Sequence, residues 1–137
     1  MVAIDAARAS AEEASPSAAL WHVLTHSGRQ RAPLDAISWG RRVQELDAGE
    51  ILLTSWDRDG TRSGYDLELL RAMRQATSLP IIASGGAAST HHLIEAIDAG
   101  ADAVLAASIF HEGETTCTRL KQSIQQEFHR TDIKVRL

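Results

Sequence analysis

The chain lacks the usual marks of a secreted, membrane-spanning or nucleic-acid-binding protein. Its 137 residues include one cysteine, Cys117, so an internal disulfide is excluded and a reducing cytoplasm is the expected location. The formal net charge of −4 argues against a surface for nucleic acid or an anionic membrane. No stretch reaches the ~18 apolar residues that span a bilayer, and no signal peptide is visible at the N-terminus.

The sequence also shows no residue pattern typical of a metal site or of a reactive thiol. Cys117 lies in a predicted helix without a histidine or second cysteine at ligand spacing, which favours a plain buried or surface thiol over a nucleophile. His26, His91, His92 and His111 show no metal-ligand pattern, and we interpret them as residues of the surface or of a pocket mouth. We therefore expect neither a metal nor a cofactor.

What the sequence does contain is a dense polar loop at 56–66, directly after an apolar segment at 51–55. The loop holds aspartates, glycines and hydroxyl residues, with Asp59 and Gly60 near its middle. Two further apolar segments end in small residues, PIIASGG at 80–86 and VLAAS at 104–108. Ligand sites of α/β sheets and barrels lie at the carboxyl ends of parallel strands, and turns there offer free N–H groups to phosphates. These three strand ends together predict a phosphate site.

Segments with strand character alternate with amphipathic segments along the chain. Predicted strands occupy 2–4, 20–25, 50–55, 81–83 and 103–106, predicted helices occupy 34–46, 66–77, 89–100 and 116–128, and 6–19 is expected to be a loop. The first helix has Ile37, Val43 and Leu46 at helical spacing. Asp66 is expected to cap the second helix, and Ser89 or Thr90 the third. The last three strands start 30 and then 22 residues apart, which suits right-handed βα units.

Four such units make half of an eight-stranded (βα)8 TIM barrel, which takes roughly 250 residues in all. We therefore predict an α/β half-barrel of four βα units with parallel strands, forming one domain over residues 1–137. The first strand begins without a lead-in, as in a chain that starts inside a longer fold. An open arc leaves unpaired edges and an exposed apolar inner face, so we expect an oligomer or a missing complement.

The motifs at these strand ends resemble the cyclase subunit of imidazole glycerol phosphate synthase, from histidine biosynthesis. The matching segments are VAIDA at 2–6, EILLTS at 50–55, DRDGT at 57–61, SGYD at 63–66, PIIASGG at 80–86, AGAD at 99–102, AASIFH at 106–111 and VRL at 135–137. The resemblance covers the chain from end to end, is weakest over 9–19, and corresponds to the C-terminal half of that barrel. It implies the cyclase reaction of the family, in which a phosphoribulosyl aminoimidazole carboxamide ribonucleotide and ammonia give imidazole glycerol phosphate and AICAR.

The resemblance also implies roles for individual residues. Asp5 matches the second of the family's two essential aspartates, a carboxylate that can shuttle protons during ammonia attack and ring closure. The positions implied to bind phosphate or substrate are Asp59, Gly60, Ser84, Gly85, Gly86, Ala107 and Ser108, with Thr54 at the same strand mouth. From the residues alone, the plainer alternatives stay open: Asp5 as a helix cap or loop residue, Gly85-Gly86 as a tight turn, and Thr54 as a barrel-interior hydroxyl. Asp57 is expected to stabilise the loop.

Two classes of function follow from this interpretation. The first is a cyclase half-barrel, a lyase in lineage, that pairs with an N-terminal half-barrel or with itself and belongs with a glutaminase subunit in the intact enzyme. The family's first aspartate and its other phosphate site have no counterpart in the chain, so the chain alone is expected to be weakly active or inactive. The alternative is a non-catalytic phosphate-binding half-barrel, truncated, split or engineered, that assembles by dimerisation.

Overall fold

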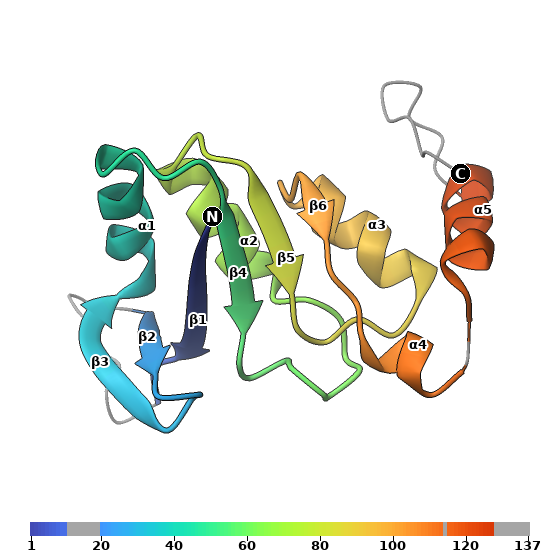
Figure 1. Ribbon diagram of the computed structural model, residues 1–137, viewed down its shortest axis with the longest axis horizontal. Coiled ribbons are helices and arrows are strands. Elements are labelled where there is room, and N and C mark those ends of the chain that lie inside the picture. Colours follow the sequence, from blue (N-terminus) through green and yellow to red (C-terminus); the bar gives the residue numbers. More distant parts are fainter. Residues whose placement is uncertain (11–19, 114, 128–137) are drawn as a thin grey trace.

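The computed structural model describes residues 1–10, 20–113 and 115–127, which form a six-stranded sheet with helices (Figure 1). The strands are β1 (Val2–Arg8), β2 (Trp21–Thr25), β3 (Gln30–Asp35), β4 (Ile51–Ser55), β5 (Ile81–Ser84) and β6 (Ala103–Val104). The helices are α1 (Ala36–Glu45), α2 (Leu67–Ala76), α3 (Thr90–Asp98), α4 (Ser108–His111) and α5 (Cys117–Glu127). The described residues include no helix long and apolar enough to cross a membrane.

The order across the sheet is β3-β2-β1-β4-β5-β6. Strands β1, β4, β5 and β6 pair in parallel, whereas β2 and β3 add an antiparallel extension beside β1. The four parallel strands, separated by helical connections, confirm the predicted α/β arrangement of a partial barrel. Because parallel strands end at the same edge of a sheet, the loops after β4, β5 and β6 meet there.

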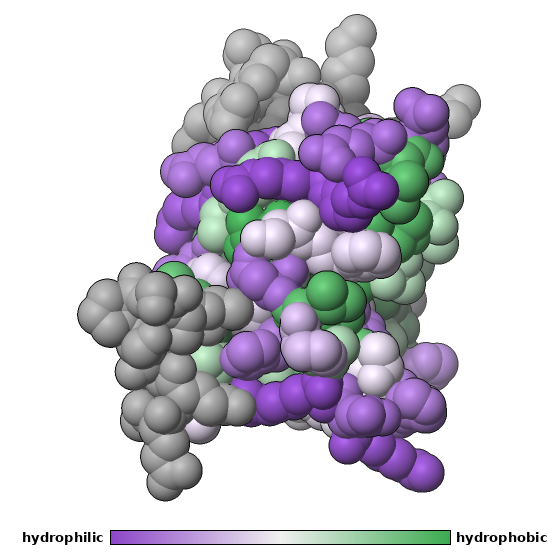
Figure 2. Space-filling view, turned by 90° about the vertical axis from the view of Figure 1, so that its left-hand side faces the viewer, coloured by the Kyte–Doolittle hydropathy of each residue, from purple (hydrophilic) through white to green (hydrophobic). Residues whose placement is uncertain are grey.

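The parallel strands have one buried and one open face. On the buried face, the core side chains of β1, β4 and β5 that are at most 1% exposed include Ile4, Ile51, Leu53, Ile81 and Ala83. The intervening residues Ala3, Leu52 and Ile82 lie on the opposite face and keep part of their surface exposed. Figure 1 shows α2 and α3 behind the sheet, and none of the described elements covers its front. In Figure 2 this open face forms the right-hand edge, where hydrophobic residues gather in the upper part.

Each of the three longer helices that follow a strand begins at a side-chain cap. Asp35 accepts a hydrogen bond from the Ser38 N–H at 2.7 Å, and Asp66 accepts one from the Leu69 N–H at 3.0 Å. Ser89 caps α3 through its hydroxyl. The predicted caps Asp66 and Ser89 are therefore confirmed, and each cap contributes about 1 kcal/mol to helix stability.

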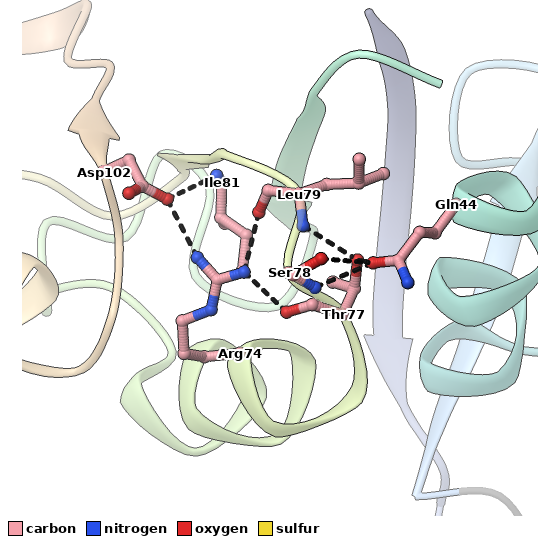
Figure 3. A network of polar contacts seen from close by, with 7 residues as sticks. All are labelled: Gln44, Arg74, Thr77, Ser78, Leu79, Ile81 and Asp102. Atoms are coloured by element: carbon pink, nitrogen blue, oxygen red, sulfur yellow. Dashed lines mark hydrogen bonds and ion pairs between the residues drawn. The ribbon is translucent and has the colours of Figure 1, made fainter. Parts of the chain in front are cut away.

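A polar network stabilises the amino-terminal end of the sheet, between α1, α2 and the start of β5 (Figure 3). Arg74 lies 3.0 Å from the Asp102 carboxylate and donates to the Thr77 carbonyl at 2.5 Å. The Gln44 side-chain oxygen accepts from the Thr77 hydroxyl at 2.6 Å and from the Ser78 N–H at 2.7 Å. This end of the sheet is thus held by side chains of the helices, away from the carboxyl ends of the strands.

The first predicted strand and the loop after it were placed wrongly. β1 continues to Arg8, because its second half pairs with the antiparallel strand β2. The predicted loop at 6–19 is therefore wrong over 6–8, and its residues 11–19 lie outside the described part of the chain. Strand β3 was not predicted, and Leu34 belongs to it, so α1 begins only after the cap Asp35.

Three predictions further along the chain were also inaccurate. The predicted helix at 34–46 ends one residue early, at Glu45, and Leu46 is 59% exposed after its last turn. The predicted strand at 103–106 is shortened to Ala103–Val104, an edge strand that pairs only with β5 among the described residues. The short helix α4 follows it without having been predicted. Cys117 is exposed at the start of α5, and position 128 and the closing motif at 135–137 lie outside the described residues.

Candidate functional site

Three of the proposed site residues form one row across the open face of the sheet. Asp5 of β1 pairs in register with Thr54 of β4, and Thr54 pairs with Ser84 of β5. In-register neighbours on parallel strands point to the same side, so the three polar side chains lie side by side. All three are half-buried, in contrast to the fully buried residues before them on each strand. The row thus places a carboxylate and two hydroxyls near the carboxyl ends of the strands.

Asp5 occupies a different place on its strand from the one predicted. The sequence put it directly after a short strand, whereas β1 runs three residues further. It still lies near the end of the parallel portion, which stops at the pairing of Ala6 with Ser55. The Asp5 carboxylate has no hydrogen-bond partner among the described residues, so both of its oxygens can take part in proton transfer.

A cavity of about 140 Å³ lies beside this row, where the loops after β4, β5 and β6 meet. Seven of the residues named from the sequence line it: Asp59, Gly60, Ser84, Gly85, Gly86, Ala107 and Ser108. Its wall also includes residues that were not predicted, namely Arg62, Ala87, Leu105 and Ala106. Asp5 and Thr54 do not line the cavity, and Ser84 connects it to the polar row.

The wall of the cavity at Gly85 and Gly86 requires glycine at both positions. Their φ angles are +94° and +95°, a region that side-chain-bearing residues rarely adopt. A Cβ atom on Gly85 would lie 2.6 Å from the Ser55 carbonyl oxygen, and one on Gly86 would lie 2.2 Å from the Gly64 carbonyl oxygen. The Gly64 N–H donates to the Gly86 carbonyl at 2.9 Å. The loop after β4 therefore packs directly on the backbone of the loop after β5.

Four residues of the cavity wall have backbone N–H groups without a protein partner among the described residues. Within the described ranges, the N–H groups of Gly85, Gly86, Ala107 and Ser108 donate to no protein acceptor. We call these four residues the cradle. Backbone N–H groups gathered in a turn form a receptor for anions, and the Ser108 hydroxyl adds a further donor. Chemically, the cradle can receive a phosphate, while the Asp59 carboxylate can accept hydrogen bonds from sugar hydroxyls.

Tyr65, which sequence reasoning did not single out, connects the polar loop to the cradle. Its hydroxyl donates to the Leu105 carbonyl at 2.8 Å, two residues before Ala107. The ring is 4% exposed, and burial raises the pKa of Tyr65, so the phenol remains a hydrogen-bond donor. Asp57 accepts a hydrogen bond from the Arg8 N–H at 2.6 Å, which agrees with its expected role in stabilising the loop.

A larger open hollow of about 870 Å³ also borders the loop but contains none of the proposed site residues. Its wall mixes arginines with carboxylates, and Arg8 pairs with Glu68 across it. The hydrogen bond from Arg8 lowers the pKa of Glu68, which is an exposed side chain. Opposite charges that satisfy one another at an exposed surface indicate a solvated ion-pair network. The smaller cavity is therefore the better candidate for a ligand site.

In the part of the chain that the structure describes, no group of three or more histidine, cysteine, aspartate or glutamate residues is placed to hold a metal ion.

The sequence of this chain is similar to that of known proteins of histidine biosynthesis. The sequence profile of a family described as histidine biosynthesis protein matches residues 1–116. The imidazole glycerol phosphate synthase subunit HisF of Salinispora tropica is 50% identical to this chain over 129 residues. That match covers 94% of this chain and 49% of the relative, so the chain spans about half the length of the curated relative it matches.

Proposed function

This chain belongs to the histidine biosynthesis protein family, and from that premise we propose that it forms one half of an imidazole glycerol phosphate synthase cyclase barrel. In this proposal residues 1–137 are a single half-barrel domain. Asp5 is its catalytic residue, and the cradle with Asp59, Gly60 and Ser84 binds one phosphate end of the substrate. The substrate is the phosphoribulosyl aminoimidazole carboxamide ribonucleotide, and the products are imidazole glycerol phosphate and AICAR.

The observation that carries the proposal is the connection of the polar row to the cradle through Ser84. Asp5 and Ser84 lie two strand spacings apart, which is about 10 Å. A ligand with its phosphate in the cradle therefore has its reacting atoms within reach of Asp5. The unpaired carboxylate of Asp5 can accept a proton when ammonia attacks and return it during elimination. Thr54 lies between Asp5 and Ser84 and can hydrogen-bond the part of the ligand that joins its phosphate to its reacting atoms.

A second carboxylate, opposite Asp5, has to come from another half-barrel. The open face of the sheet supports this requirement, because Leu52, Ile82 and Leu105 expose apolar surface there, Leu105 to 42%. Burying such a face stabilises association by about 25 cal/mol per Å². We propose an N-terminal half-barrel as the preferred partner and a second copy of this chain as the substitute. A glutaminase subunit would supply ammonia in the intact enzyme. A cytoplasmic location stays a prediction from the single cysteine.

The test is ammonia-dependent cyclisation of the substrate, measured with this chain alone and after mixing it with the other half of the Salinispora tropica relative. We expect turnover in the mixture and little or none with the chain alone. Asp5→Asn in the mixture is expected to abolish turnover without weakening association of the halves. Asp47→Asn is the matched control, because Asp47 is exposed just beyond α1 and should leave turnover unchanged.

Turnover that survives Asp5→Asn would refute the catalytic role of Asp5. No turnover in the mixture, together with saturable binding of phosphate at the cradle, would favour the non-catalytic half-barrel instead. Sedimentation equilibrium of the chain alone provides an independent check. A chain that stays monomeric at tens of micromolar would contradict the proposed self-association.

A further inference from the structure

Arg62 is the cationic side chain on the cavity wall, and nothing in the sequence had singled it out. The lining residues include one carboxylate, Asp59, and one guanidinium, Arg62; the rest are glycine, serine, alanine and leucine. A phosphate placed in the cradle would face the negative charge of Asp59 across a small cavity. A balancing positive charge is therefore needed for a phosphate dianion, and Arg62 is the lining residue that can provide it.

The position of Glu112 relative to the cradle shows how Arg62 can reach an anion. Arg62 forms an ion pair with Glu112 in this structure. The Glu112 N–H donates to the Ser108 carbonyl at 2.9 Å, so Glu112 lies one helical turn after Ser108. One turn corresponds to about 5 Å along the helix axis, a distance that an arginine covers by changing its side-chain torsions. Both side chains are part-exposed, at 38% and 53%, which leaves them room to move.

The backbone at Arg62 provides a separate observation. Its φ angle is +64°, in the left-handed region that glycine adopts without cost and a residue with a Cβ does not. The loop already uses glycine at the neighbouring left-handed positions Gly60 and Gly64. A long cationic side chain held at such a position has a cost in stability, and that cost is explained when the side chain serves a ligand.

We propose that Arg62 is a phosphate-binding residue of the site and that Glu112 competes with the phosphate for its guanidinium. In the unliganded protein Arg62 pairs with Glu112. A phosphate in the cradle draws the guanidinium toward its oxygens and completes a set of donors from three loops. This inference rests on the proposed function, since it takes the cradle to be a phosphate site. With Arg62 as a ligand-binding residue, the site selects dianionic ligands over neutral sugars.

The experiment measures binding of inorganic phosphate and of ribose 5-phosphate to the full chain by amide NMR titration, with Gly85 and Gly86 as reporters. Arg62→Gln is expected to raise both dissociation constants about ten- to hundredfold, because a charge-assisted hydrogen bond is lost. Arg62→Lys keeps the charge and should lose about three- to tenfold. Glu112→Gln removes a competitor and should tighten binding about threefold.

The opposite signs of the two effects distinguish a ligand-binding residue from a structural link between loops. If the ion pair only holds the loops together, Arg62→Gln and Glu112→Gln would weaken binding equally, and the inference would be wrong. Arg42→Gln is the matched control, since it breaks an exposed ion pair with Glu45 on α1 and should leave binding unchanged.

The remaining outcomes separate this inference from the proposal on which it rests. Binding by the unmodified chain that Arg62→Gln leaves unchanged would overturn the role of Arg62 and keep the phosphate site. An unmodified chain that shifts neither glycine amide would overturn the phosphate site and the inference together. Unchanged amide spectra away from the cavity would show that each variant is folded.

Discussion

Replacing Gly86 by alanine is expected to cost far more stability than a single methyl group normally does. The new Cβ would lie 2.2 Å from the Gly64 carbonyl oxygen and 2.9 Å from its carbon. Normal contact needs roughly 1 Å more, so the loop after β4 has to move away from the loop after β5. That movement breaks the 2.9 Å hydrogen bond from the Gly64 N–H to the Gly86 carbonyl.

The size of the effect follows from two separate costs. Forcing alanine to a φ of +95° costs about 1–2 kcal/mol, and the lost hydrogen bond costs about 1 kcal/mol more. We therefore expect the free energy of unfolding to fall by about 2–3 kcal/mol. That is a large share of the 5–15 kcal/mol that stabilises a typical domain.

Urea denaturation followed by circular dichroism measures this loss, and two other glycines serve as matched controls. Gly60→Ala places a Cβ in open space at a φ of +71°, so only backbone strain should lower its free energy of unfolding, by about 1 kcal/mol. Gly49→Ala meets no atom within 4 Å and its φ lies outside the left-handed region, so it should be neutral or stabilising by about 0.5 kcal/mol. A Gly86→Ala variant that loses no more stability than Gly60→Ala would refute the close contact between the two loops.

One pH titration and two further variants test contacts that the tertiary structure creates. Tyr65 is the single tyrosine of the chain, and because burial raises its pKa, its absorbance at 295 nm should show no phenolate until the pH is well above 10. The folded state then holds this proton more tightly than the unfolded state, so the contribution of Tyr65 to stability should be constant below pH 10 and fall as the pH rises further. A normal titration near pH 10 in folded protein would contradict this. Tyr65→Phe leaves the Leu105 carbonyl without its donor and should cost about 1–2 kcal/mol in urea denaturation. Asp66 both caps α2 and accepts a hydrogen bond from the buried Trp21 indole N–H at 3.1 Å, so Asp66→Ala should lower the free energy of unfolding by about 2–3 kcal/mol. Asp35→Ala removes a cap alone and should lower it by about 1 kcal/mol. Equal losses would show that the indole contact contributes nothing.

Most of the secondary structure could be predicted because its determinants are local. Asp66 and Ser89 precede apolar helical segments and cap their own helices three residues on. Alternating helices and apolar strands of the right length then imply parallel pairing, and parallel pairing brings the ends of β4, β5 and β6 together. The grouping of Ser84 with Asp59 around one cavity follows from that topology.

The errors arose where pairing between distant segments overrides local preference. β1 was predicted to end at Ile4, but the hairpin of β2 and β3 pairs with its second half and extends the strand to Arg8. The first helix was predicted to begin at Leu34, but β3 pairs with β2 as far as Asp35, so α1 starts only at Ala36. In both cases the number of residues in an element was decided by its neighbours.

The sequence by itself determined the class of fold, the strand ends that surround the cavity and the family to which the chain belongs. These features depend on residue type and on spacing along the chain, which can be read without coordinates. Only the tertiary structure decided which distant residues meet near the cavity: Arg62 meets Glu112 across 50 positions of sequence, and Tyr65 meets Leu105 across 40. Contacts of that kind depend on how three loops pack after the sheet has formed, because the close approach of Gly64 to Gly86 fixes where each neighbouring side chain can lie.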